Sequence, residues 1–213
     1  MPGLLPNVDP DGLLEYSVVS TDRAVNHMSQ QFQEVMRDIS STLQRVYGAN
    51  AVAVVPGSGT FGMEAVARQF ATDKKCLIIR NGFFSFRWTQ ILDMGSIPAS
   101  STVLKAGPVE EGPNPSYAPP PLDQVVATIE AEQPDVVFAP HVETSSGMIL
   151  PKDYIRGVAK AVHAAGGLFV LDCVASGTVW VDMELSLIHI SAPTSQGMNS
   201  YAVFCLKKKR GGG

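Results

Sequence analysis

The feature that most limits the fold of this chain is a regular alternation of short apolar runs with segments of helical spacing. The apolar runs are "AVAVV" (51–55), "CLIIR" (76–80), "STVLK" (101–105), "DVVFA" (135–139) and "GLFVLD" (167–172). Apolar strands joined by helices are typical of a parallel sheet that is covered on both faces. The sequence therefore predicts an α/β fold with a mostly parallel sheet and helices on both faces.

The segments between these runs have the spacing of amphipathic helices. Apolar residues recur every three or four positions from about Ser29 to Tyr47, which predicts a helix before the first strand. Further helices are predicted over 60–71, 85–94, 122–132 and 153–165. A Pro-rich loop, "AGPVEEGPNPSYAPPP", precedes the third of these four.

Composition excludes several classes of function. The chain has 213 residues, 45% of them apolar, enough for one sizeable core and the beginning of a second domain. A formal net charge of −4 leaves no basic face for nucleic acid, and no apolar run of about 18 residues could span a membrane. The start of the chain does not resemble a secretion signal, and three cysteines form neither a disulfide framework nor a metal motif. We therefore expect a cytoplasmic protein.

The C-terminal segment differs from the rest. From Leu185 onward we find neither helical nor strand periodicity, and the final "KKKRGGG" corresponds to a run of A followed by a run of G read as codons. "LSLIHIS" and "YAVFCL" resemble translated sequencing adapters; the alternative is a solvated basic tail. We expect 1–184 to be the N-terminal segment and a partial large domain, and 185–213 to be a non-native tail that packs poorly or not at all.

A glycine-rich turn follows the first predicted strand. Residues 57–62, "GSGTFG", fit the pattern G-x-G-x-x-G and would direct backbone N–H groups and hydroxyls at an anion such as a phosphate. A dinucleotide site would also need an acidic residue about 20 positions later, where Arg80 and Asn81 stand. Two alternatives remain: an NADP-type site with Arg80 on a 2′-phosphate, and glycines that only allow helix packing.

Three further loops complete a pattern. Phe84 follows the second strand and Thr144 the fourth, while Asp172 ends the fifth with a carboxylate whose burial is costly without a cationic partner. A protonated pyridine nitrogen is such a partner. A phosphate cradle, an aromatic plate, a hydroxyl and a buried carboxylate together indicate a site for pyridoxal 5′-phosphate. His141 and Glu143 suit either an acid–base pair or local hydrogen bonds.

Four motifs in this order and spacing, "PGSGTFGMEA", "NGFFSFRW", "HVETSSG" and "LDCVASGTVWVDM", resemble those of the class V aminotransferases. These are fold-type I pyridoxal phosphate enzymes that include alanine–glyoxylate and serine–pyruvate aminotransferases. The likeness extends over nearly all of 1–184. It implies a homodimer that transfers an amino group from an amino acid to a 2-oxo acid.

The resemblance also implies a role for each cofactor-binding residue. Ser58, Gly59 and Thr60 would hold the phosphate. Phe84, where aminotransferases of this family usually carry Trp, would stack on the ring, and Val174 would pack on its other face. Thr144 would bond the phenolic oxygen, and Asp172 would pair with the ring nitrogen.

The chain departs from the family pattern after Glu184. Members carry the Schiff-base lysine one strand beyond the aspartate, and a small C-terminal domain supplies an arginine for the substrate carboxylate. Neither feature is found in "LSLIHISAPTSQGMNSYAVFCLKKKRGGG". We therefore expect no catalytic lysine in this chain, weak non-covalent cofactor binding and no aminotransferase activity.

Overall fold

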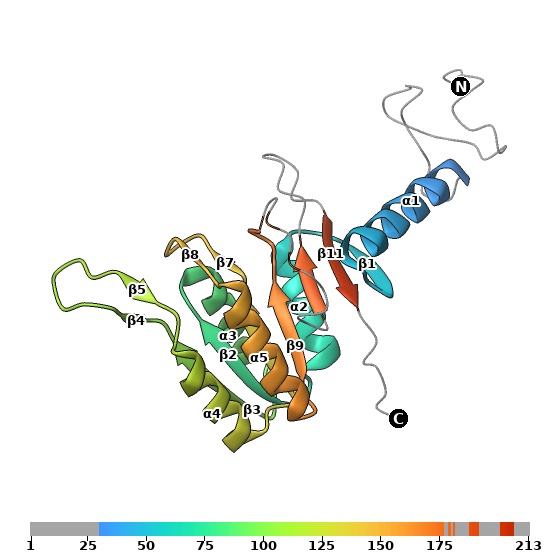
Figure 1. Ribbon diagram of the computed structural model, residues 1–213. Coiled ribbons are helices and arrows are strands. Elements are labelled where there is room, and N and C mark those ends of the chain that lie inside the picture. Colours follow the sequence, from blue (N-terminus) through green and yellow to red (C-terminus); the bar gives the residue numbers. More distant parts are fainter. Residues whose placement is uncertain (1–29, 177–178, 180, 182–187, 192–200, 207–213) are drawn as a thin grey trace.

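A seven-stranded sheet forms the centre of the computed structural model, which describes residues 30–176, 179, 181, 188–191 and 201–206 (Figure 1). The strand order is β1-β11-β10-β9-β6-β2-β3. The strands are β1 (Ala51–Pro56), β2 (Lys75–Arg80), β3 (Ser100–Lys105), β6 (Val136–Pro140), β9 (Leu168–Asp172), β10 (Ile188–Ser191) and β11 (Tyr201–Leu206). Among these described strands β11 runs in the direction opposite to the other six, which all point the same way, so the predicted mostly parallel sheet is confirmed.

Helices cover both faces of the sheet, as predicted. They are α2 (Gly59–Phe70), α3 (Phe83–Met94), α4 (Leu122–Glu132) and α5 (Lys152–Ala164). Side chains alternate between the faces of a strand, so Leu77 and Ile79 pack with α4 and α5, whereas Cys76 and Ile78 pack with α2 and α3. In Figure 1, α4 and α5 lie in front of the sheet.

Helix α3 is fixed to the sheet by an aromatic contact. The ring of Trp88 lies 4.4 Å, centroid to centroid, from that of Phe138 on β6, and both side chains are fully buried. Burial of two such rings contributes several kcal/mol of hydrophobic stabilisation. The contact therefore holds in place the helix that carries Phe84.

A further helix, α1 (Gln30–Tyr47), packs at the β1 end of the sheet. Leu43 and Tyr47 contact Val52 and Val54 and are partly buried, whereas Val35 and Val46 are about half exposed. No helix within the described ranges combines the length and the apolar content that crossing a membrane requires. The predicted helix over 29–47 is thus confirmed, with an apolar side that this chain covers only in part.

The predicted strands and helices agree with the structure to within about two residues, but two small hairpins were not predicted. β4 (Gly107–Pro108) pairs with β5 (Tyr117–Ala118) in the Pro-rich loop. β7 (Val142–Glu143) pairs with β8 (Met148–Ile149) after β6. Strands of two residues are too short to show a hydrophobic period, so the sequence gives no signal for them.

The sequence predicts that residues after about 185 pack poorly or not at all, but two stretches of this segment pair with the sheet through their backbones. β10 pairs with β9 in parallel, and β11 pairs with β10 and β1, so that the two strands fill the sheet between β1 and β9. Ile188–Ser191 and Tyr201–Leu206 are rich in branched and aromatic residues, which favour strands, and open sheet edges accept such segments through their backbones. Pairing of this kind does not depend on the origin of the segment, so its non-native origin stays a proposal.

Candidate functional site

The candidate site lies where β1, β2, β6 and β9 end. These strands run in the same direction, so the loops that follow them meet at one edge of the sheet, the edge at which ligands bind in open α/β folds. The β7–β8 hairpin stands at this edge, beside the end of β9 (Figure 1). The four loops in which the sequence predicted ligand contacts are therefore brought together.

The glycine loop begins helix α2 and touches the loop that follows β9. Ser58 is the N-cap of α2, and its side chain makes no capping bond within the described residues. The first turn of a helix, here with Gly59 and Thr60, presents backbone N–H groups that suit an anion. A Cβ atom added at Gly59 would lie 3.1 Å from Cγ1 of Val174. Only glycine allows this approach without displacing Val174.

Phe84 and Arg87 project from the first turns of α3. Phe84 is 43% exposed, so that its ring is accessible to solvent. The guanidinium of Arg87 lies 5.7 Å from the centroid of that ring, and its Nη1 donates to Oγ1 of Thr60 at 2.7 Å. The sequence analysis did not single out Arg87. Arg87 lies three residues after Phe84, a spacing that places both side chains on the same side of a helix. This spacing could have indicated Arg87 as a residue of the site.

Glu143 caps the N-terminus of α3 from the β7–β8 hairpin. Its carboxylate accepts hydrogen bonds from the backbone N–H groups of Phe84 (3.0 Å) and Ser85 (2.8 Å), and from the hydroxyls of Ser85 and Ser145. Burial acts to raise the pKa of Glu143, but these bonds outweigh it and hold the pKa below its usual value. The sequence left open whether Glu143 forms an acid–base pair with His141 or makes local hydrogen bonds, and the structure shows local hydrogen bonds.

Gly82 makes room for that cap. A Cβ atom there would lie 2.4 Å from Oγ of Ser145 and 2.7 Å from Cγ of Glu143. The close approach also fixes Thr144, which lies between these two residues and is exposed at the tip of the hairpin. The cap thus holds the hairpin that carries Thr144 against the helix that carries Phe84.

Asp172 is buried at the end of β9. Burial raises the pKa of this carboxyl to about 6, although the N–H of Val174, at 3.1 Å from Oδ1, lowers it, as do the indole of Trp88 and the charge of Arg87. Nε1 of Trp88 is near enough to lower the pKa of Asp172, although its position does not meet the geometry of a normal hydrogen bond. A buried carboxylate with a raised pKa is stabilised by an added cation, as a protonated ring nitrogen would be.

His141 lies at the end of β6 and is also buried. Its Nδ1 is 2.7 Å from Oγ of Ser176, and its backbone N–H donates to the carbonyl of Asp172. Burial lowers the pKa of His141, so that its imidazole is neutral near pH 7. His141 and Glu143 thus bond to different partners and do not form an acid–base pair in this structure.

Two other features bear on the site. The carboxamide Oδ1 of Asn81, at the end of β2, is buried and has no hydrogen-bond partner among the described residues. The guanidinium of Arg80 lies 4.9 Å from the centroid of the Phe86 ring. The structure therefore places Arg80 against an aromatic ring.

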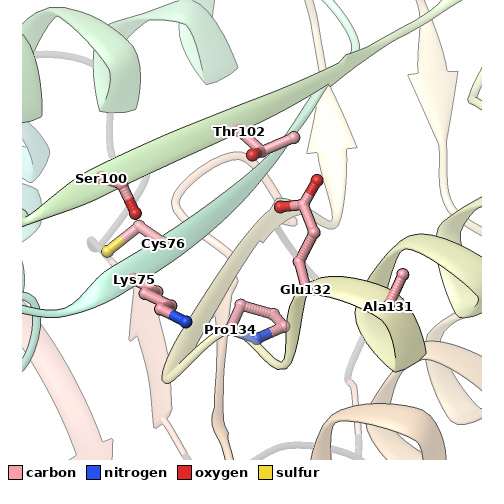
Figure 2. Close-up of a pocket in the computed structure, with 7 residues that line it drawn as sticks. All are labelled: Lys75, Cys76, Ser100, Thr102, Ala131, Glu132 and Pro134. Carbon is pink, nitrogen blue, oxygen red and sulfur yellow. The ribbon is translucent and has the colours of Figure 1, made fainter.

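A pocket of about 290 Å³ occurs away from this edge, where β2 and β3 begin, and Figure 2 shows the residues that line it. Cys76 is one of the lining residues, and burial raises the pKa of its thiol to about 12, with the charge of Asp135 contributing. The thiol stays protonated near pH 7 and is a poor nucleophile. This pocket therefore offers no thiolate chemistry.

No protein-family model matches the chain. The alanine–glyoxylate aminotransferase of Mus musculus is 27% identical over 178 residues, which are 82% of this chain and 40% of that protein. The 2-aminoethylphosphonate–pyruvate transaminase of Vibrio vulnificus (strain CMCP6) is 31% identical over 134 residues, 61% of this chain and 33% of that protein. The ureidoglycine–glyoxylate aminotransferase from Bacillus subtilis superposes with a TM-score of 0.70 at 19% identity, over 86% of this chain and 46% of that one.

The chain therefore spans less than half the length of these relatives. Its sequence relatives are aminotransferases, and its structural neighbours include pyridoxal phosphate-dependent proteins. The similarities confirm the resemblance to pyridoxal phosphate-dependent aminotransferases that the four sequence motifs indicated.

Proposed function

We propose that this chain is the cofactor-binding part of a class V aminotransferase that transfers an amino group from an amino acid to a 2-oxo acid. Residues 1–184 supply the N-terminal segment and part of the large domain, and 185–213 are a non-native tail. The kinship with aminotransferases and the meeting of the four predicted loops at one sheet edge support this proposal.

The residues at this edge fit pyridoxal 5′-phosphate. Ser58, Gly59 and Thr60 would bind the phosphate at the start of α2, and Phe84 and Val174 would enclose the ring. Thr144 would bond the phenolic oxygen, and Asp172 would hold a proton on the ring nitrogen. When bound, the protonated ring takes up the electrons that a substrate carbon releases on losing its proton.

The observation that carries the proposal is the placement of Asp172. Its carboxylate is buried, has a raised pKa, and bonds the N–H of Val174, the residue that touches Gly59. The phosphate cradle and the buried carboxylate are thus joined through two short contacts. One small ligand with an anionic and a cationic end satisfies both.

The catalytic lysine is part of the same proposal. The lysines in the described residues are Lys74, Lys75, Lys105, Lys152 and Lys160. None of them lies in the loops that follow β1, β2, β6 and β9. We infer that the chain binds the cofactor without a covalent bond and has no aminotransferase activity, because a base for the proton shift is missing.

The decisive experiment has two steps. Pyridoxal 5′-phosphate is first titrated into the 213-residue chain and binding is followed by absorbance, with NADP as the competing ligand. The complex is then reduced with borohydride and analysed by mass spectrometry. We expect saturable binding of pyridoxal phosphate, none of NADP, and no stoichiometric adduct on one lysine. An adduct on a single lysine within 1–184 would contradict the inference that this chain lacks the catalytic lysine. Binding of NADP would support the dinucleotide alternative.

A homodimer and a cytoplasmic location complete the proposal. The apolar side of α1 that the chain covers only in part, with Val35 and Val46 exposed, supports association with a second copy. Cys76 and Cys173 are buried and form no disulfide, as is usual in a reducing compartment. Light scattering on the chain, and on a version continued past Glu184 with its authentic sequence, tests the dimer; a monodisperse monomer in both would contradict it.

A further inference from the structure

Arg87 connects three parts of the candidate site. It lies on α3, donates from Nη1 to Oγ1 of Thr60 on α2 at 2.7 Å, and stands 5.7 Å from the ring centroid of Phe84. The sequence motifs assign it no role. It lies beside a predicted phosphate contact without being one of the predicted ligands.

The direction of the Arg87–Thr60 hydrogen bond has a chemical consequence. A guanidinium has only donors and is always charged, so Oγ1 of Thr60 must be the acceptor. A hydroxyl that accepts this bond still carries one proton of its own, which it must donate to a different acceptor. Thr60 lies in the first turn of α2, where an anion is favoured, and a phosphate oxygen is an acceptor of that kind.

We propose that Arg87 is a positioning residue that turns the Thr60 hydroxyl into a hydrogen-bond donor for the phosphate group of the ligand. The inference rests on the proposed function, because it presumes a phosphate at the start of α2. It adds that the affinity for the phosphate depends on a residue of α3 that acts through Thr60. The positive charge of Arg87 also favours a dianion nearby.

A matched pair of ligands isolates the phosphate. Pyridoxamine 5′-phosphate and pyridoxamine share the ring and differ in the phosphate, and neither has an aldehyde that could react with surface lysines. Their dissociation constants are measured by fluorescence with the full chain and with Arg87→Met, Thr60→Val and the double variant. We expect Arg87→Met and Thr60→Val each to weaken binding of the phosphorylated ligand about tenfold or more, and binding of pyridoxamine less than twofold.

The double variant tests whether Arg87 acts through Thr60. If it does, adding Arg87→Met to Thr60→Val costs clearly less affinity than Arg87→Met costs alone, because the hydroxyl that Arg87 orients is already absent. Effects that multiply independently would overturn the inference. Arg87→Lys, which keeps the charge but not the planar fork, guards against misfolding of the Met variant and should retain only part of the affinity.

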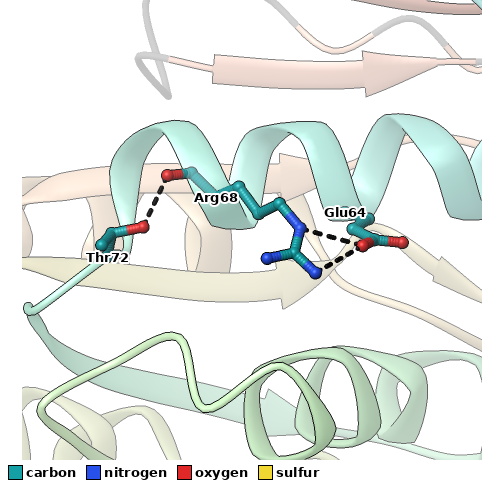
Figure 3. Close-up of polar contacts among 3 residues, drawn as sticks. All are labelled: Glu64, Arg68 and Thr72. Carbon is teal, nitrogen blue, oxygen red and sulfur yellow. Dashed lines mark hydrogen bonds and ion pairs between the residues drawn. The ribbon is translucent and has the colours of Figure 1, made fainter.

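Arg68 provides the control. It lines the same pocket of about 390 Å³ between α2 and α3 that Thr60 and Arg87 line, but its guanidinium bonds the carboxylate of Glu64 on the same helix (Figure 3). Arg68→Met removes a positive charge from this pocket and should change the affinity for pyridoxamine 5′-phosphate less than twofold. An equal loss in the Arg68 and Arg87 variants would show a general charge effect and overturn the inference.

The outcomes separate this inference from the proposed function. If the unmodified chain binds neither ligand, the proposed cofactor site itself fails. If it binds the phosphorylated ligand, but Arg87→Met weakens both ligands equally, the site stands and Arg87 has only a structural role in joining α2 to α3. Thermal unfolding of each variant shows whether a loss of affinity reflects a loss of fold.

Discussion

Val174 closes against Gly59: a Cβ atom at residue 59 would lie 3.1 and 3.2 Å from the two γ-carbons of Val174. The residues are far apart in the sequence, and their contact joins the turn after β1 to the loop after β9. The same Val174 donates its backbone N–H to Asp172. The position of the glycine loop, which we propose binds the phosphate, is therefore coupled to the orientation of the buried carboxylate.

The first prediction uses this contact. Gly59→Ala should weaken binding of pyridoxamine 5′-phosphate at least tenfold, because the new methyl group displaces Val174 or the start of α2 by a few tenths of an ångström. Val174→Ala removes the γ-carbons, so the double variant Gly59→Ala/Val174→Ala should bind more tightly than Gly59→Ala alone. Titration by fluorescence measures both. A double variant no better than the single one would show that Val174 is not the obstacle.

The second prediction concerns the cap on α3. Glu143→Gln keeps the shape but replaces one acceptor oxygen by a donor that faces backbone N–H groups, and we expect it to lower the free energy of unfolding by about 1–3 kcal/mol at pH 7. The pKa of Glu143 is lowered in the folded state, so its stabilisation is present above the unfolded value of 4.5 and is lost as the pH falls through the folded value. Urea unfolding of both proteins at several pH values measures the difference.

Exposed Glu130 on α4 provides the comparison for that experiment. Glu130→Gln should change the free energy of unfolding by less than about 0.5 kcal/mol at every pH. If Glu143→Gln behaves like Glu130→Gln, the hairpin carboxylate does not stabilise α3.

The third prediction concerns Asp172. Burial raises its pKa from 3.8 to about 6, so between these values the unfolded chain releases the proton before the folded chain does, and the free energy of unfolding falls as the pH rises. The full loss is roughly 3 kcal/mol. Asn at residue 172 does not titrate, so the free energy of unfolding of Asp172→Asn should exceed that of the unmodified chain above pH 6. The difference between the two proteins should vanish towards pH 4. Urea denaturation of both proteins above pH 6 and near pH 4 measures this difference.

The same substitution should weaken ligand binding while it stabilises the fold. An amide cannot balance the positive charge of a protonated ring nitrogen, so Asp172→Asn should bind pyridoxamine 5′-phosphate at least tenfold more weakly at pH 7. A variant that loses both stability and affinity would show that the carboxylate serves the fold and not a ligand.

Much of this architecture was predictable because it depends on local periods. Apolar runs and helical spacing gave the positions of β2, β6, β9 and the helices, and the direction of parallel strands placed their loops together. The hydrogen bond between Arg87 and Thr60 was not predictable, because the two residues lie on different helices, although the spacing of Arg87 from Phe84 places both on one side of α3. Glu143 caps α3 by bonding Phe84 and Ser85, from which it is separated in the sequence by 59 and 58 positions. No local pattern encodes a bond over such a separation.

The segment beyond Glu184 shows the opposite case. Its sequence resembles translated adapters, and yet two stretches of it pair with the sheet. Strand pairing uses backbone groups that all residues share, so composition and origin say little about whether an open edge will accept a segment.

The fourth prediction follows from these pairings. A chain that ends at Glu184 leaves the facing edges of β1 and β9 without β11 and β10 between them. Its amide hydrogens in residues 51–55 of β1 should exchange much faster than in the 213-residue chain, whereas those of Leu77–Ile79 in β2 should change little. Hydrogen exchange with mass spectrometry measures both. Equal protection of β1 in the two chains would mean that α1 alone holds it in place.

The strand order also has a consequence for how this 213-residue chain folds. β1 is the first described strand, but it stands at one end of the sheet and pairs with β11, the last described strand. The strand before the glycine loop therefore finds its neighbour in the sheet only about 150 residues later in the sequence, and such distant pairing slows folding. A folding chain would assemble β2, β3, β6 and β9 first, with the glycine loop as the last part of the candidate site to be fixed.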